Sequence, residues 1–192
     1  AICEILFPTK GKNGAFQDHA FFEASSIRKV DGKYCFVYSS EHNHDLCYAM
    51  ADSPKGPFTY GGVLVDIGDL YLNGNEDETH ASNYLGNTHG GMLQIEDQWY
   101  IFYHRQTNHS SYARQACAEK LERRNDGGFQ QAEITSCGLN QGALKGIGAY
   151  EARIACNLWS INGTGRYDGK SPKQKLKDHP YFTQSGKDRE NN

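Results

Sequence analysis

The chain has no long apolar run and no strong excess of charge of either sign. None of its hydrophobic stretches approaches the roughly 20 residues that a membrane-spanning helix needs, so no membrane partner is expected. Its 192 residues carry 20 Lys and Arg against 23 Asp and Glu, for a formal net charge of -3. This balance does not predict nucleic-acid binding, and a neutral polymer suits it better. Residues 1–8 lack a basic segment followed by an apolar one, so they predict no signal peptide.

Cysteine spacing excludes another class of protein. The chain contains six cysteines, but none form a C-x-x-C pair, which argues against a zinc ribbon. Cys35, Cys47 and Cys117 lie in apolar, strand-like runs, and we expect them to be free buried thiols. Cys137 and Cys156 lie in a loop-rich segment, where spacing leaves their pairing open.

One strand pattern occurs twice, at residues 21–38 and 87–103. In each copy a short apolar strand, a two-residue acidic turn and an aromatic-rich strand follow one another, which is typical of a β-hairpin. Repetition of such a unit predicts an all-β fold made of propeller blades. Two blades cannot cover every hydrophobic face of a propeller, so we expect neighbouring blades outside this sequence.

The remaining segments extend this organisation. Further strands are predicted at residues 46–51 and 58–65, which complete a four-stranded sheet, and at residues 112–118. A final strand is an option at 133–136. The stretch from 66 to 87 has no periodicity and predicts a long loop. After residue 120 the pattern weakens, and the Lys-rich segment 170–177 predicts extended connection; no helix of convincing length is predicted anywhere.

Each repeat has one ionisable residue just before its first strand: Glu23 in the first copy and His89 in the second. A radial array would direct both toward a shared axis. Glu23 follows two Phe residues and precedes small ones, a setting typical of a carboxyl group that works as a general acid. His89 precedes two glycines that allow close approach of backbone or of a ligand. The alternative interpretations are that Glu23 is an ordinary surface or ion-paired residue and that His89 has only a structural role.

Other polar residues give weaker signals. The guanidinium of Arg114 could bind a hydroxyl or carboxylate, or could form an ordinary ion pair. His42 and His44 are potential metal ligands, but no third ligand follows at a recognised spacing, so a polar turn is favoured. Residues 76–78 resemble a calcium loop only in charge and predict a solvated loop.

The chain closely resembles glycoside hydrolase family 43. Five segments in order carry the resemblance, over about residues 20 to 120: Phe21–Lys29, Leu46–Ala49, Ser53–Phe58, Asn87–Gly91 and Trp99–Arg105. The resemblance implies a five-bladed β-propeller, of which this chain holds about the last two blades plus an irregular C-terminal extension. It divides the chain into a connection from absent preceding blades (1–20), the blades with the general acid (21–120), and an extension and linker toward a C-terminal β-sandwich (121–192).

The same resemblance implies a function and a site. It implies an O-glycosyl hydrolase of the α-L-arabinofuranosidase or β-xylosidase type, acting with inversion on arabinose- or xylose-containing plant polysaccharides or oligosaccharides. Glu23 matches the general acid, Arg114 the arginine that binds sugar hydroxyls, and His89 the axial histidine that contacts a calcium ion or its water. No cofactor is required, and a structural calcium is implied. The base and a second, pKa-tuning Asp are expected on the missing blades, and an extracellular or periplasmic location is favoured.

Two other functions stay open at this stage. A non-catalytic carbohydrate-binding or interaction fragment would keep the propeller surface without the base. A metal-dependent hydrolase built on His42, His44 and His89 is disfavoured by the ligand spacing.

Overall fold

The computed structural model describes residues 16, 18–83, 85–107, 110–135, 138–139, 147–149, 157–160 and 180–183. Most of the predicted connection 1–20 lies outside these ranges. So do Cys137 and Cys156, whose pairing the sequence leaves open, and the Lys-rich segment 170–177. The chain divides into two compact units. The first holds residues 1–65, 88–103 and 120–132, and the second holds residues 66–87, 104–119 and 133–192.

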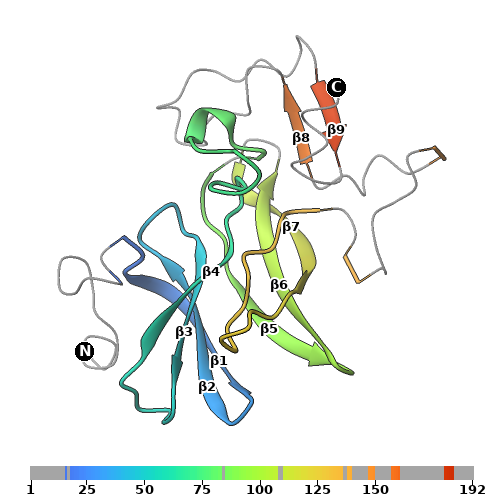
Figure 1. Cartoon of the computed structure of the whole chain (residues 1–192). Coiled ribbons are helices and arrows are strands. Elements are labelled where there is room, and N and C mark those ends of the chain that lie inside the picture. Colours follow the sequence, from blue (N-terminus) through green and yellow to red (C-terminus); the bar gives the residue numbers. More distant parts are fainter. Residues whose placement is uncertain are drawn as a thin grey trace. The chain divides into compact units, whose positions relative to one another are not determined.

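An antiparallel four-stranded sheet forms most of the first unit. Its strands are β1 (Phe21–Val30), β2 (Lys33–Ser40), β3 (Leu46–Ala51) and β4 (Thr59–Val65), paired in the order in which they occur along the chain (Figure 1). The β1–β2 turn contains Asp31 and Gly32, both with positive φ, as a tight hairpin of this hand requires. This meander confirms the predicted all-β fold and the predicted four-strand unit.

The core of this sheet is aromatic. Its buried cluster contains Phe16, Tyr38, Cys47, Ala49, Ala51 and Phe58, with five partly buried hydrophobic residues packed against it. Alternating side chains of the strands supply this face, because successive residues of a strand point to opposite sides of the sheet. Cys35, Cys47 and Cys117 are buried free thiols, as predicted.

The second predicted hairpin is also present. Strands β5 (Gly90–Ile95), β6 (Gln98–Thr107) and β7 (Ser110–Leu121) form a three-stranded sheet in that order. β5 and β6 pair in unbroken register from Gly90 opposite Tyr103 to Ile95 opposite Gln98. β6 and β7 contribute residues to both units.

The sequence allows one more strand at residues 133–136. In the structure, residues 133–135 form no strand. Side chains take the place of a ladder partner there: the Ile134 N–H donates to Asp69 Oδ1 at 2.8 Å, and the Thr135 N–H donates to Glu119 Oε1 at 2.9 Å. Carboxylates satisfy these backbone donors without a neighbouring strand.

Residues 122–132 form a segment that we call the strap. The Ala132 N–H donates to the Leu64 carbonyl on β4 at 2.8 Å, and the Gln130 N–H donates to the Glu122 carbonyl at 2.9 Å. Phe129 is 1% exposed, and its backbone N–H donates to the Tyr48 hydroxyl at 2.8 Å. The strap therefore fixes part of the edge strand β4 within the first unit.

The predicted loop at 66–87 has a buried polar interior. It holds one 3-10 turn, η2 (Glu78–His80). Asp66 Oδ1 accepts the N–H groups of Gly68 and Leu70, and Asp69 Oδ2 accepts the Ser82 hydroxyl at 2.8 Å. Backbone groups in a loop without a ladder need such partners, which explains its many acidic and amide residues.

Two short strands lie in the region where an irregular extension was expected. They are β8 (Asn157–Ser160) and β9 (Pro180–Thr183), which pair antiparallel. Both contain aromatic residues that favour strands, but four residues are too few to establish an alternating pattern. No helix among the described residues is long and apolar enough to cross a membrane.

Candidate active site

Glu23 lies at an irregularity of β1. The pairing of β1 with β2 shifts register on both sides of Glu23, which lies opposite Ser39. The next residue, Ala24, has a φ of 58°, a conformation that is uncommon outside glycine. Bulges of this kind redirect side chains and are frequent next to active sites.

His89 reaches Glu23 through a short chain of contacts. Ser39, the register partner of Glu23, donates its hydroxyl to the Thr88 carbonyl at 2.9 Å, and both residues are fully buried. Thr88 immediately precedes His89. The strand pairing and this single side-chain hydrogen bond therefore bring the two sequence-predicted residues to the same place.

The Glu23 carboxyl and the His89 imidazole are hydrogen-bonded. His89 Nε2 and Glu23 Oε1 are 2.8 Å apart. The side chains are 43% exposed for Glu23 and 36% for His89, so the carboxyl is less enclosed by apolar rings than the sequence suggested. The imidazole holds one carboxyl oxygen in place, and the exposure leaves the group within reach of a ligand.

Packing of β5 against the first sheet supports this pair. Arg28 Nε donates to the Met92 carbonyl at 3.0 Å, and the Cys35 thiol lies 3.5 Å from the Met92 sulfur. Gly90 and Gly91, directly after His89, allow the close approach: a Cβ on Gly90 would lie 2.7 Å from Leu46 Cδ1. The predicted close approach at these glycines is thus seen, with protein as the approaching group.

Arg114 is an exposed residue of β7 in the second unit. It shares no unit with Glu23 and His89, and its role in binding sugar stays a prediction.

The weaker sequence signals have structural explanations. Asp77 caps η2 by accepting the Thr79 N–H at 2.8 Å, and the Thr79 hydrogen bonds lower the pKa of Asp77. Residues 76–78 therefore belong to a capped turn. Glu76 and Asp77 are exposed, in agreement with the predicted solvated loop. Among the described residues, His42, His44 and His89 are not grouped as metal ligands, which removes the geometric basis of the metal-hydrolase reading.

One group of side chains was missed. His19, Asp45 and Cys47 place their ligand atoms within 4.8 Å of one another. The spacing of His42 and His44 points to further ligands only among the residues that follow them. His19 precedes them in the chain, before β1. The contact depends on strand pairing, which no local spacing encodes.

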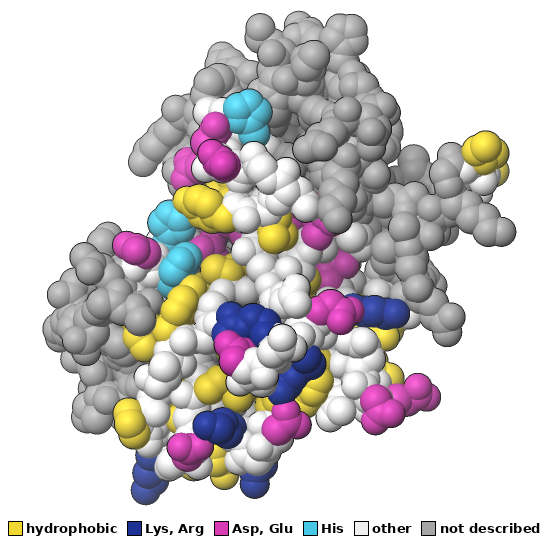
Figure 2. Space-filling view, viewed as in Figure 1, with side chains coloured by type: hydrophobic (Ala, Val, Ile, Leu, Met, Phe, Trp, Pro, Cys, Tyr) yellow, Lys and Arg dark blue, Asp and Glu magenta, His cyan; other side chains and the backbone are white. Residues whose placement is uncertain are grey.

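A hollow of about 280 Å³ lies elsewhere in the first unit, lined in part by Tyr48, Arg123, Arg124 and Asp126. Its arginines are already neutralised: Arg123 pairs with Asp31, and Arg124 with Asp126. On the face drawn in Figure 2, basic side chains likewise lie beside acidic ones. Such pairing does not favour an anionic ligand.

Comparison with known proteins gives the family. No family model matches the chain. A xylosidase/arabinosidase of Thermoclostridium stercorarium is 41% identical over 186 residues, which cover 96% of this chain and 39% of that protein. The chain belongs to glycoside hydrolase family 43. It spans about two fifths of the length of that relative and a smaller share of the others.

Two further matches cover less of the chain. A β-xylosidase of Xylanibacter ruminicola is 39% identical over 87 residues, 45% of this chain and 22% of that protein. The crystal structure of the GH43_1 enzyme from Xanthomonas citri in complex with xylose is 29% identical, with a TM-score of 0.47, over 59% of this chain and 30% of that one.

Proposed function

We propose that this chain supplies the general acid of a family 43 glycosidase that hydrolyses arabinose- or xylose-containing polysaccharides or oligosaccharides with inversion. The observation that carries the proposal is the hydrogen bond between Glu23 and His89 at a bulge of β1. The names of the relatives, xylosidase/arabinosidase and β-xylosidase, support the substrate class.

In the proposed reaction, the Glu23 carboxyl gives its proton to the glycosidic oxygen as the bond from that oxygen to the anomeric carbon breaks. A water molecule attacks the anomeric carbon from the opposite face and loses its proton to a carboxylate base. Inverting enzymes hold their two carboxyl groups about 6.5 to 9.5 Å apart to admit that water. His89 orients the acid, and Arg114 binds hydroxyl groups of the sugar.

We assign no base among the described residues. The base and the pKa-tuning Asp expected from the resemblance belong to blades outside this sequence. The proposal therefore concerns the role of this chain within a complete propeller, whether the other blades come from the same chain or from a partner.

The resemblance implies a calcium ion at His89. Calcium takes six to eight oxygen ligands. Among the described residues, no group of three or more potential metal ligands includes His89. These side chains alone do not fit a calcium site, and no step of the proposed reaction uses the ion.

The first experiment is hydrolysis of aryl α-L-arabinofuranosides and β-D-xylosides by the purified chain, with the product anomer followed by NMR. We expect inverted product from one sugar class once the missing blades are added, because they carry the base. Retained configuration would contradict the mechanism. No hydrolysis together with binding of xylo- or arabino-oligosaccharides by calorimetry would favour the non-catalytic alternative.

The role of Glu23 is tested by Glu23→Gln in the active protein. We expect a loss of about 10²- to 10⁴-fold on substrates with poor leaving groups, because general acid catalysis contributes that much, and a far smaller loss on activated aryl glycosides. Glu96→Gln, in the exposed β5–β6 turn, is the matched control. An equal loss on both substrate types would assign Glu23 another role.

A further inference from the structure

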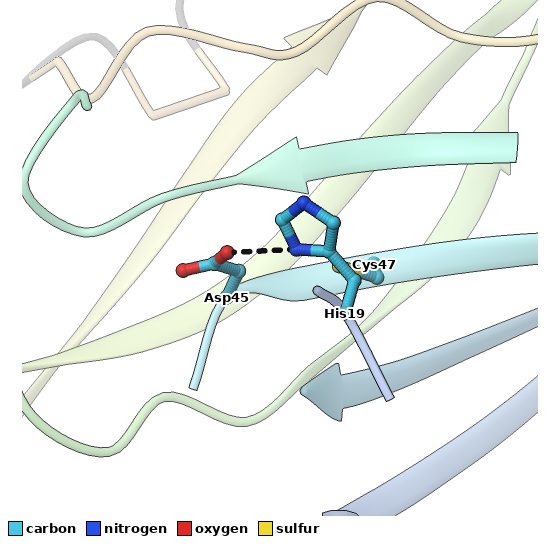
Figure 3. A group of neighbouring side chains, drawn as sticks. All are labelled: His19, Asp45 and Cys47. Atoms are coloured by element: carbon cyan, nitrogen blue, oxygen red, sulfur yellow. Dashed lines mark ion pairs between the residues drawn. The ribbon is translucent and has the colours of Figure 1, made fainter. Parts of the chain in front are cut away.

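The buried group formed by His19, Asp45 and Cys47 lies in the first unit and contains neither Glu23 nor His89. Figure 3 shows the His19 imidazole facing the Asp45 carboxylate, with Cys47 close by. The side chains of His19 and Asp45 are 21% and 3% exposed, and Cys47 is fully buried. A carboxylate at such depth is costly unless positive charge or hydrogen-bond donors compensate it.

Local structure fixes two of these ligands. The β2–β3 connection turns back through Asn43 and His44, both with positive φ, and closes with the Ser40 N–H donating to the Asp45 carbonyl at 2.9 Å. Asp45 therefore lies at the entrance of β3. Cys47 follows two residues later, and residues two apart in a strand share a face.

The third ligand comes from the segment before β1. The His19 ring stacks on the Tyr60 ring, with centroids 5.4 Å apart and an angle of 7° between planes. The His19 carbonyl accepts the Tyr38 hydroxyl at 2.7 Å. The stacked ring and this hydrogen bond hold His19 in position.

The ligand atoms of His19, Asp45 and Cys47 lie within 4.8 Å of one another, and the contacts of Asp45 with two imidazoles are close to the spacing around a small cation. His19 Nδ1 lies 3.2 Å from Asp45 Oδ2, and His42 Nδ1 lies 3.4 Å from the same oxygen. Ligand bonds of about 2.0 to 2.3 Å in a tetrahedral zinc site separate neighbouring ligand atoms by roughly 3.3 to 3.6 Å. A small adjustment of these side chains would therefore admit an ion.

The donor types select the metal. Imidazole nitrogen, thiolate sulfur and carboxylate oxygen are the ligands of zinc, whereas calcium and magnesium take oxygen alone. We propose that His19, Asp45 and Cys47 bind a zinc ion, and that the half-exposed His42, which lies outside this group but 3.4 Å from Asp45 Oδ2, rotates in as the fourth ligand at the rim. The site clamps the segment before β1 to the β2–β3 connection, a structural role independent of the proposed catalysis.

The test uses the full 192-residue chain, stripped of metal with a chelator. Zinc titration by calorimetry should give one site, and cobalt should give a thiolate-to-metal absorption band. Cys47→Ser should remove that band and weaken zinc binding at least tenfold. Cys35→Ser is the matched control, because burial raises the pKa of the Cys35 thiol to about 12 and no metal-ligand group among the described residues contains it.

A second readout covers variants that fold poorly. Zinc at tenfold its dissociation constant should raise the melting temperature of the unmodified chain by about 3 to 6 °C, and His42→Ala, at the rim, should reduce this shift while leaving the circular dichroism unchanged. Absence of any zinc-dependent shift in the unmodified chain would overturn the proposal. Binding that persists unchanged in both Cys47→Ser and Asp45→Asn would do the same.

Discussion

At the scale of single residues, Ser39 has an influence that its chemistry alone does not suggest. It lies opposite Glu23 in the β1–β2 pairing and donates its hydroxyl to the carbonyl before His89. One small side chain thus joins the strand of the candidate acid to the strand of its imidazole partner. Ser39 is a positioning residue and takes no part in the chemistry.

We predict that Ser39→Ala lowers the free energy of unfolding by about 1 to 3 kcal/mol, because the buried Thr88 carbonyl loses this donor. The His89 imidazole resonances in NMR should shift as its contact with Glu23 loosens. Urea unfolding and NMR measure the two effects. Ser25→Ala, at an exposed site on β1, is the control, and Ser39→Thr should restore much of the loss. Unchanged His89 resonances in Ser39→Ala would remove the positioning role.

Sequence alone could predict that Glu23 and His89 lie close together, because each occupies the same position in a repeated hairpin; their roles stay predictions. It could not predict Ser39 or His19. The contacts of both depend on which residues lie opposite each other across strands or beside a distant turn, and neither residue type stands out in the local pattern. The grouping of His19 with Asp45 and Cys47 was missed for the same reason.

At the scale of elements, the approach of β5 to the first sheet depends on Gly90. A Cβ there would clash with the Phe102 carbonyl oxygen and the Leu46 side chain. At Gly91 the nearest atom to such a Cβ is the Ser26 hydroxyl at 3.0 Å, the end of a short side chain that can rotate. The two neighbouring glycines therefore have different tolerances.

Gly90→Ala should destabilise the chain by about 1 to 3 kcal/mol, in the range seen when extra atoms are forced into packed sites. Gly91→Ala should cost less, and the pair forms its own control. Chemical denaturation of both variants measures the difference. Equal stability of the two variants would show that the clash at Gly90 is relieved by movement of β5.

The elements themselves were predictable where apolar and aromatic residues form strand-length runs, as in β1 to β7. Prediction failed where side chains replace a ladder, as at residues 133–135, and where strands are as short as β8 and β9. Composition correctly indicated a loop at 66–87, but its buried carboxylates contact groups far along the chain, which spacing cannot encode.

At the scale of the whole molecule, several large apolar side chains of the first unit remain exposed on β1 and β5. They are Phe22 at 48%, Ile27 at 41%, Leu93 at 50% and Ile95 at 38%. Apolar residues on strands with an unpaired edge favour association with other chains. The expectation of further blades, in the same or another chain, stays a prediction.

We predict that the isolated chain associates with itself as its concentration rises, because apolar surface on β1 and β5 is removed from water. Sedimentation velocity over a concentration series measures this. The double variant Ile27→Lys, Leu93→Lys should be more monomeric, while Ile147→Lys, at another exposed position, should change little. A strictly monomeric unmodified chain at high concentration would contradict the prediction.

The strap has a consequence for synthesis on the ribosome. Leu64 on β4 is translated early, but its partner Ala132 leaves the exit tunnel only after the whole of β5 to β7 has been made. Until then β4 exposes a backbone carbonyl that the finished molecule satisfies. The nascent chain therefore passes through a period in which its first sheet is complete in strands but open at one edge, the stage at which a chaperone has most to protect.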